Sequence, residues 1–184
     1  MQIKDTRNKI QTEQSKPYHQ LILVIGIGNA YRSDDGVGFV VAQHLKEQTS
    51  DTVTVAKESG DGVALMESWE CAPVVILIDA VYSGGKPGTI HRFDAHVQQI
   101  PVQFFHYSTH AFGIAEAIEL TRILGKLPPC LIVYGIEGKC FEAGVGLSSE
   151  VSNAAQEVAI RIQQDILNIN HRKTRNDTEN CTHI

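Results

Sequence analysis

Short aliphatic runs alternate along this chain with segments in which apolar residues recur at helical spacing. The first run covers residues 21–25, and Val37, Val41 and Leu45 follow it at intervals typical of an amphipathic helix. Aliphatic strands joined through helices form parallel sheets that are covered on both faces. The pattern therefore predicts an α/β fold, a single three-layer domain with a mostly parallel twisted sheet and helices on both faces. Further strands are expected at 52–56, 74–78, 89–93 and 131–134, and further helices at 63–70, 110–124 and 148–166.

The length and the polar ends of the chain set its domain organisation. A chain of 184 residues can bury one sizeable core but is short for two full domains. Residues 1–20 and 171–184 are polar and lack an apolar period. We therefore expect a flexible N-terminal arm at 1–20, the α/β domain at 21–170 and a flexible polar tail at 171–184.

Charge and hydropathy exclude several classes of partner. The net charge of −5 offers no broad basic field for nucleic acid. No aliphatic run approaches the roughly 20 residues needed to cross a bilayer, and the first residues lack the apolar region of a secretory signal. We expect a cytoplasmic protein with no membrane span and no nucleic-acid partner.

A glycine-rich loop that carries two acids follows the first expected strand. A dinucleotide fingerprint would need a glycine three residues after Gly28, but Tyr31 stands there. Asp34 and Asp35 lie where the next helix begins and would repel a phosphate group. The loop therefore suits a cation or a neutral polar ligand. The alternative is that the two acids only cap the helix or complement its first turn.

Two further candidate residues lie near other expected element ends. Asp79 ends an aliphatic strand, where a buried carboxylate needs a cation, a metal or hydrogen-bond donors; alternatively, it caps the following turn. His110 precedes a helix and is a weak signal by itself. Loops converge at the carboxyl ends of parallel strands, so these side chains would offer the mixed oxygen and nitrogen ligands that borderline divalent metals accept. The residues alone thus predict an open, acid-lined metal site.

Six short motifs occur in a fixed order along the chain. In that order the chain resembles the hydrogenase maturation endopeptidases, which remove a C-terminal peptide from the large-subunit precursor of nickel-iron hydrogenases. The resemblance extends from about residue 21 to residue 166. The motifs are Gly-Ile-Gly-Asn at 26–29, Arg-Ser-Asp-Asp-Gly-Val-Gly at 32–38, Glu-Ser-Gly-Asp-Gly at 58–62, Ile-Asp-Ala at 78–80, Ser-Thr-His at 108–110 and Tyr-Gly-Ile-Glu at 134–137.

The resemblance implies both a site and a mechanism. It assigns metal binding and catalysis to Asp35, Asp79 and His110, and it links the segment Gly60, Asp61 and Gly62 to substrate recognition. It also implies that nickel is supplied by the substrate precursor rather than permanently bound. Recognition of that ion would restrict cleavage to precursor that already carries its metal, and it would place the scissile bond beside the site. The ion could also polarise the carbonyl or activate water, with an Asp as general base.

Two alternatives from other classes remain open at this point. A non-catalytic nickel-binding or chaperone module would use the same three ligands but cut nothing. A small nucleotide-binding α/β enzyme would need a phosphate cradle, which Asp34 and Asp35 oppose. A precursor-processing assay separates the first alternative from a peptidase, and a nucleotide-retention assay tests the second.

Overall fold

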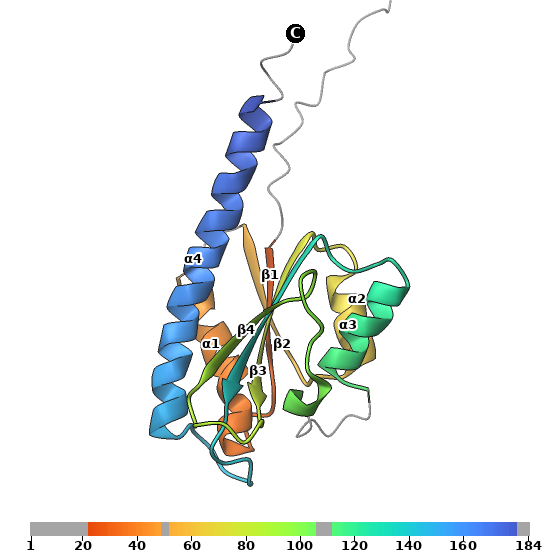
Figure 1. Ribbon diagram of the computed structural model, residues 1–184. Helices are drawn as coiled ribbons and strands as arrows, with labels where there is room; N and C mark the ends of the chain where they lie inside the picture. The colour runs from red at the N-terminus through yellow and green to blue at the C-terminus, as the bar shows by residue number, and fades with distance from the viewer. Residues whose placement is uncertain (1–21, 49–51, 106–111, 180–184) are drawn as a thin grey trace, which may run out of the picture.

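A single five-stranded sheet forms the centre of the protein (Figure 1). The computed structural model describes residues 22–48, 52–105 and 112–179. In this part of the chain the strands lie in the order β2-β1-β3-β5-β4, and all neighbours are parallel except β4 and β5. The expected mostly parallel sheet is confirmed. The strands are β1 (Ile22–Ile27), β2 (Val53–Glu58), β3 (Val74–Val81), β4 (Ile90–Asp94) and β5 (Cys130–Glu137).

Helices cover both faces of the sheet, as the sequence predicts (Figure 1). On one face, α1 (Val37–Lys46) packs beside α4 (Ser149–Glu179). On the other, α2 (Gly62–Trp69) packs beside α3 (Ile114–Ile123). Two short 3-10 helices, η1 (Ser33–Gly36) and η2 (Val102–Phe105), lie in the connections.

Each face of the sheet has its own apolar core, because successive side chains of a strand point to opposite faces. In β3, which is buried along its whole length, Ile76 and Ile78 belong to the core under α1 and α4. Val75 and Leu77 belong to the core under α2 and α3. This burial on both faces explains why the strands are continuous aliphatic runs in the sequence.

Two helix boundaries differ from the expected ones. The third helix begins at Ile114 rather than near residue 110, and the Gly113 backbone N–H donates to Oε2 of Glu116 at 3.1 Å. The last helix continues to Glu179, through most of the segment expected as a tail. Its last described contacts with the core come from Ile166 and Ile169, and its C-terminal part projects beyond the sheet (Figure 1). The N-terminal arm lies outside the described residues.

The described helices also bear on the expected absence of a membrane span. In the ranges that the structure describes, no helix combines the length and the apolar character that crossing a bilayer requires.

Candidate active site

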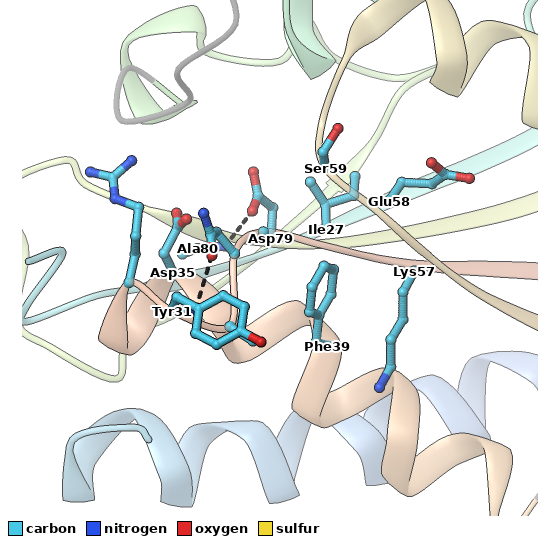
Figure 2. Close-up of a pocket in the computed structure, with 13 residues that line it drawn as sticks. Ile27, Tyr31, Asp35, Phe39, Lys57, Glu58, Ser59, Asp79 and Ala80 are labelled. Carbon is cyan, nitrogen blue, oxygen red and sulfur yellow. Dashed lines mark hydrogen bonds between the residues drawn. The ribbon is translucent and has the colours of Figure 1, made fainter. Parts of the chain in front are cut away.

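A cavity of about 450 Å³ opens at the carboxyl ends of β1, β2 and β3 (Figure 2). This is the edge of a parallel sheet at which loops and helix starts converge to form binding sites. The lining combines acids with aromatic and cationic side chains. Its residues are Ile27, Gly28, Asn29, Ala30, Tyr31, Arg32, Asp35, Phe39, Lys57, Glu58, Ser59, Asp79 and Ala80.

Asp79 lies near the end of β3, and the residue is only 7% exposed. Its Oδ1 accepts a hydrogen bond from the Ala80 backbone N–H at 2.9 Å. Burial raises the pKa of Asp79 well above its usual value, and the nearby charge of Asp35 raises it further. Within the part of the chain that the structure describes, this one neutral donor compensates only part of the cost of burying the carboxylate.

Asp35 reaches the same cavity from η1, the short helix between β1 and α1. Burial raises the pKa of its half-buried carboxyl group, while the charge of Arg32 and a backbone hydrogen bond with Asn29 oppose that shift. Figure 2 shows the carboxyl groups of Asp35 and Asp79 directed to the same side, into the cavity. The structure therefore brings together two of the three expected metal ligands, and their repulsion favours a cation between them.

Asp34, the neighbour of Asp35, is fully buried and does not line the cavity. Its Oδ2 accepts from the backbone N–H groups of Lys139 and Cys140 at 2.9 and 3.0 Å and from Oγ of Ser148 at 3.0 Å. Its Oδ1 accepts from the Ser148 backbone N–H at 2.7 Å. Asp34 lies in the first turn of η1, as the alternative interpretation expects, but it does not cap that helix, and its carboxylate holds the loop between β5 and α4.

The predicted recognition segment follows the cavity lining in the chain. Ser59 lines the cavity, whereas Gly60, Asp61 and Gly62 do not. Asp61 is the N-cap of α2, and its Oδ1 accepts from the Ala64 backbone N–H at 3.0 Å. Gly62 donates its backbone N–H to the carbonyl oxygen of Phe112 at 2.9 Å. A role of this segment in substrate recognition stays a prediction.

His110, the third expected ligand, belongs to residues 106–111, which lie outside the described residues. Among the residues that the structure does describe, no three His, Cys, Asp or Glu side chains are grouped closely enough to hold a metal ion. Asp35 and Asp79 therefore supply two candidate ligands, and the complete set of three stays a prediction.

Sequence reasoning gave no role to several cationic and aromatic residues of the cavity. Arg32 donates from Nε and Nη2 to the carbonyl oxygen of Phe141 at 3.3 and 3.2 Å, which ties the first loop to the loop before α4. Lys57 lies 5.8 Å from the ring centre of Phe39. Tyr31 is 77% exposed at the cavity. The available sequence signal is their position beside the motifs: Tyr31, Arg32 and Phe39 lie within or beside the acidic motif, and Lys57 directly precedes the motif at 58–62.

Comparison with known proteins identifies the family. The sequence model described as hydrogenase maturation protease matches residues 39–165, which include β2, β3, β5 and most of α1. The chain belongs to the hydrogenase maturation protease family. The expected membership of a peptidase family is thereby confirmed.

Individual proteins and structures that are similar to this chain support its assignment to the maturation protease family. The hydrogenase 2 maturation protease of Escherichia coli K12 is 26% identical over 134 residues, which cover 71% of this chain and 80% of that protein. The hydrogenase expression/formation protein HupD of Thiocapsa roseopersicina is 30% identical over 118 residues, covering 63% of this chain but only 53% of that protein. The solution structure of an endopeptidase from Escherichia coli has the same fold, with a TM-score of 0.67, 24% identity and coverage of 77% of this chain and 88% of that chain.

Proposed function

We propose that this chain is an endopeptidase that removes the C-terminal extension of a nickel-loaded hydrogenase large-subunit precursor. The observation that carries the proposal is the pair of carboxyl groups, Asp35 and Asp79, directed into one cavity at the carboxyl edge of the sheet. Membership of a protease family and the names of the relatives support the reaction class. The buried, incompletely compensated charge of Asp79 supports a cation as the recognised group.

The donor set suits a nickel ion that arrives with the substrate. Two carboxylates and the imidazole of His110 would supply oxygen and nitrogen ligands, which borderline divalent ions accept. Such ligands on open loops form a weaker site than a closed thiolate site, so the ion is expected to belong to the precursor. When bound, the ion would polarise the scissile carbonyl group as a Lewis acid.

The residues of the chain would position the substrate and move a proton. Binding of the ion by Asp35, Asp79 and His110 would hold the scissile bond at the cavity. This positioning lowers the entropic cost of bringing the reacting groups together. A carboxylate oxygen of the pair that does not contact the ion would accept a proton from the attacking water. Burial raises the pKa of both groups in the chain without the ion, and a bound cation would lower it again, so this role depends on the position of the carboxylate beside the water.

A processing assay tests this proposal directly. The full chain is incubated with candidate large-subunit precursors, loaded with nickel or nickel-free, and the precursor mass is followed by mass spectrometry. We expect loss of a C-terminal peptide only from the loaded precursor. Asp79→Asn should abolish the cleavage, whereas Glu157→Gln, on the exposed face of α4, should not change it.

Three outcomes would contradict the proposal. Tight binding of loaded precursor without any mass loss would favour a non-catalytic nickel-binding or chaperone module. Equal cleavage of the nickel-free precursor would refute recognition through the ion. Normal cleavage by Asp79→Asn would refute the role of the carboxyl pair.

A further inference from the structure

We propose that a second, apolar cavity beside the candidate active site binds an aliphatic side chain of the precursor, from the segment that is removed. This inference rests on the proposed function, because it takes the bound peptide to be the hydrogenase precursor. It adds a chemical preference to the recognition of the ion, since the chain would select an uncharged, aliphatic residue close to the scissile bond. Every residue of this cavity lies in the described part of the chain.

The second cavity has a volume of about 380 Å³ and lies between α1 and the loop before α4. Its surface is mostly apolar. Phe39 and Val40 line it from α1, and Val145 and Leu147 line it from the loop. Binding pockets typically have volumes of about 300–1,000 Å³ and combine apolar walls with a few polar groups. The size and the lining therefore suit an aliphatic side chain together with the adjacent peptide backbone.

This apolar cavity shares part of its wall with the active-site cavity that holds the two carboxyl groups. Ala30, Phe39 and Lys57 line both cavities. Figure 2 shows Phe39 and Lys57 on the wall of the active-site cavity, where Nζ of Lys57 lies 5.8 Å from the centre of the Phe39 ring. An extended peptide advances about 3.3–3.6 Å per residue, so a side chain within a few residues of the bound ion reaches the neighbouring cavity. A peptide in the active-site cavity can therefore continue directly into the apolar one.

The loop that forms one wall of the apolar cavity is held in place, but an apolar side chain at its rim is left in water. Asp34 accepts hydrogen bonds from the backbone N–H groups of Cys140 and Ser148, which stand on either side of Val145 in the chain. Val145 itself is 85% exposed, and Tyr31 at the active-site cavity is 77% exposed. Large exposed apolar side chains beside a preformed cavity are typical of surfaces that bind a partner.

Charge determines which part of the precursor enters each cavity. The proposed function places the ion, and the retained part of the precursor that carries it, at Asp35 and Asp79. Lys57 is exposed at the shared wall, and its Nζ donates to the neutral Oε1 of Gln43 at 3.3 Å, so its positive charge would repel the ion from the apolar cavity. An uncharged side chain is not repelled, and its burial against Phe39 is favourable. The segment on the other side of the scissile bond, which is removed, is therefore the expected occupant.

The first experiment changes the precursor and follows the processing assay. In nickel-loaded precursor, the residues after the cut are replaced one at a time by alanine, and kcat/KM is measured by mass spectrometry. Removal of one methylene group from a side chain in a hydrophobic pocket costs about 10–200-fold. We expect a single aliphatic position at which alanine lowers kcat/KM at least about 10-fold.

The second experiment changes the apolar cavity and uses a matched control. Val40→Phe fills the cavity from α1 and Val145→Ser makes its rim polar, so each should lower kcat/KM about 10-fold with the original precursor. Neither should lower it more than about twofold with the alanine precursor, because the lost contact is then already absent. Val40 also packs against the core under α1 and α4, so the exposed Val145→Ser is the variant that leaves the fold intact. Val97→Ser changes another valine that is 81% exposed but lines neither cavity, and it should leave kcat/KM unchanged.

Methyl NMR gives a readout that does not depend on cleavage or on nickel. Overlapping synthetic peptides from the C-terminal region of the precursor are added to the full chain labelled with ¹³C in its valine and leucine methyl groups. We expect the signals of Val40, Val145 and Leu147 to shift with one of these peptides and much less with its alanine version, while the Val97 signal does not shift. Shifts of this kind without cleavage of any loaded precursor would refute the proposed function and support the apolar cavity as a peptide-binding site.

Four results would overturn the inference. The first is a precursor in which alanine is tolerated at every position after the cut. The second is an unchanged kcat/KM in both Val40→Phe and Val145→Ser, with thermal unfolding showing that they are folded. The third is an equal loss with the original and the alanine precursor, which would indicate a structural effect. The last is a Val145 signal that changes with the concentration of the chain alone, because a second copy would then cover this surface.

Discussion

Asp34 offers a sharp test because it stands next to a proposed catalytic residue and yet has a structural role. The fold surrounds its carboxylate with three backbone N–H groups and one hydroxyl group, all from residues more than 100 positions away in the chain. Asp34→Ala removes the acceptor for all of them. We expect this variant to lose stability, and to lose activity only as far as the fold is lost.

The size of the effect follows from those contacts. A donor left without an acceptor costs about 1–3 kcal/mol when it is buried. Three backbone donors lose their partner, but Lys139 and Cys140 are exposed residues, where water can replace part of the loss. Hydrogen bonds to a charged group contribute about 1.5–3 kcal/mol each, so with part of the loss replaced by water we expect a total of about 3–5 kcal/mol. For a protein of this size that corresponds to a melting temperature lower by at least about 6 °C.

The measurement compares Asp34→Ala with Asp35→Asn in urea and thermal unfolding of the full chain. Asp35 has a raised pKa because of its burial, so the neutral amide should keep or increase stability at neutral pH. A loss below about 1 kcal/mol for Asp34→Ala would refute the argument. An equal loss of stability in both variants would contradict the assignment of a structural role to Asp34 and a site role to Asp35.

Three further outcomes follow from the same structure. Asp79→Asn should stabilise the protein at neutral pH by about 1–2 kcal/mol while abolishing cleavage. Because the pKa of Asp79 is raised in the folded state, the stability of the original chain is highest below the unfolded-state pKa and falls as pH rises through the folded-state value. Urea unfolding at pH 4 and pH 8 should therefore show that the stability difference between the variant and the original chain grows with pH. Asp35→Glu should keep partial cleavage of loaded precursor, since it retains the carboxylate, whereas Asp35→Ala should keep none. A chain that ends after Asn170 should melt within a few degrees of the full chain and cleave at the same rate, since Ile166 and Ile169 are the last described core contacts of α4; a large loss of rate in a folded truncated protein would show that the projecting helix binds the precursor.

The aliphatic and helical periods predicted the layers of the fold but not the ends of its elements. The strand expected at 74–78 continues to Val81, because Ala80 and Val81 pair with Ile136 and Glu137 of β5. Such pairing depends on a partner strand about 56 residues away, so a local pattern does not contain it. The late start of α3 had a local signal, because Glu116 stands three residues after Gly113 and caps that end.

In the candidate site, too, the residues with a local sequence signal were predicted, whereas roles that depend on distant parts of the chain were not. Asp79 was found because a carboxylate directly after buried aliphatic residues needs a reason to be there. The role of Asp34 was missed because its partners lie in the loop before α4. Glu137 belongs to a recognised motif but had no assigned role. It is buried and accepts from the backbone N–H groups of Ser83 and Gly85 at 2.8 and 3.0 Å, which holds the loop after β3.

The distribution of hydrogen bonds among the buried acids supports the proposed recognition of a nickel-loaded precursor. Asp34 and Glu137 are surrounded by donors, so their charges are compensated within the fold. From the described residues Asp79 receives one hydrogen bond, and it faces the like charge of Asp35, so these residues compensate its charge only in part. A cation brought by the substrate would supply the missing compensation, and a precursor without the ion would leave the repulsion in place. The acids that the described part of the fold leaves incompletely compensated are therefore the ones that would give the proposed site its selectivity for the ion.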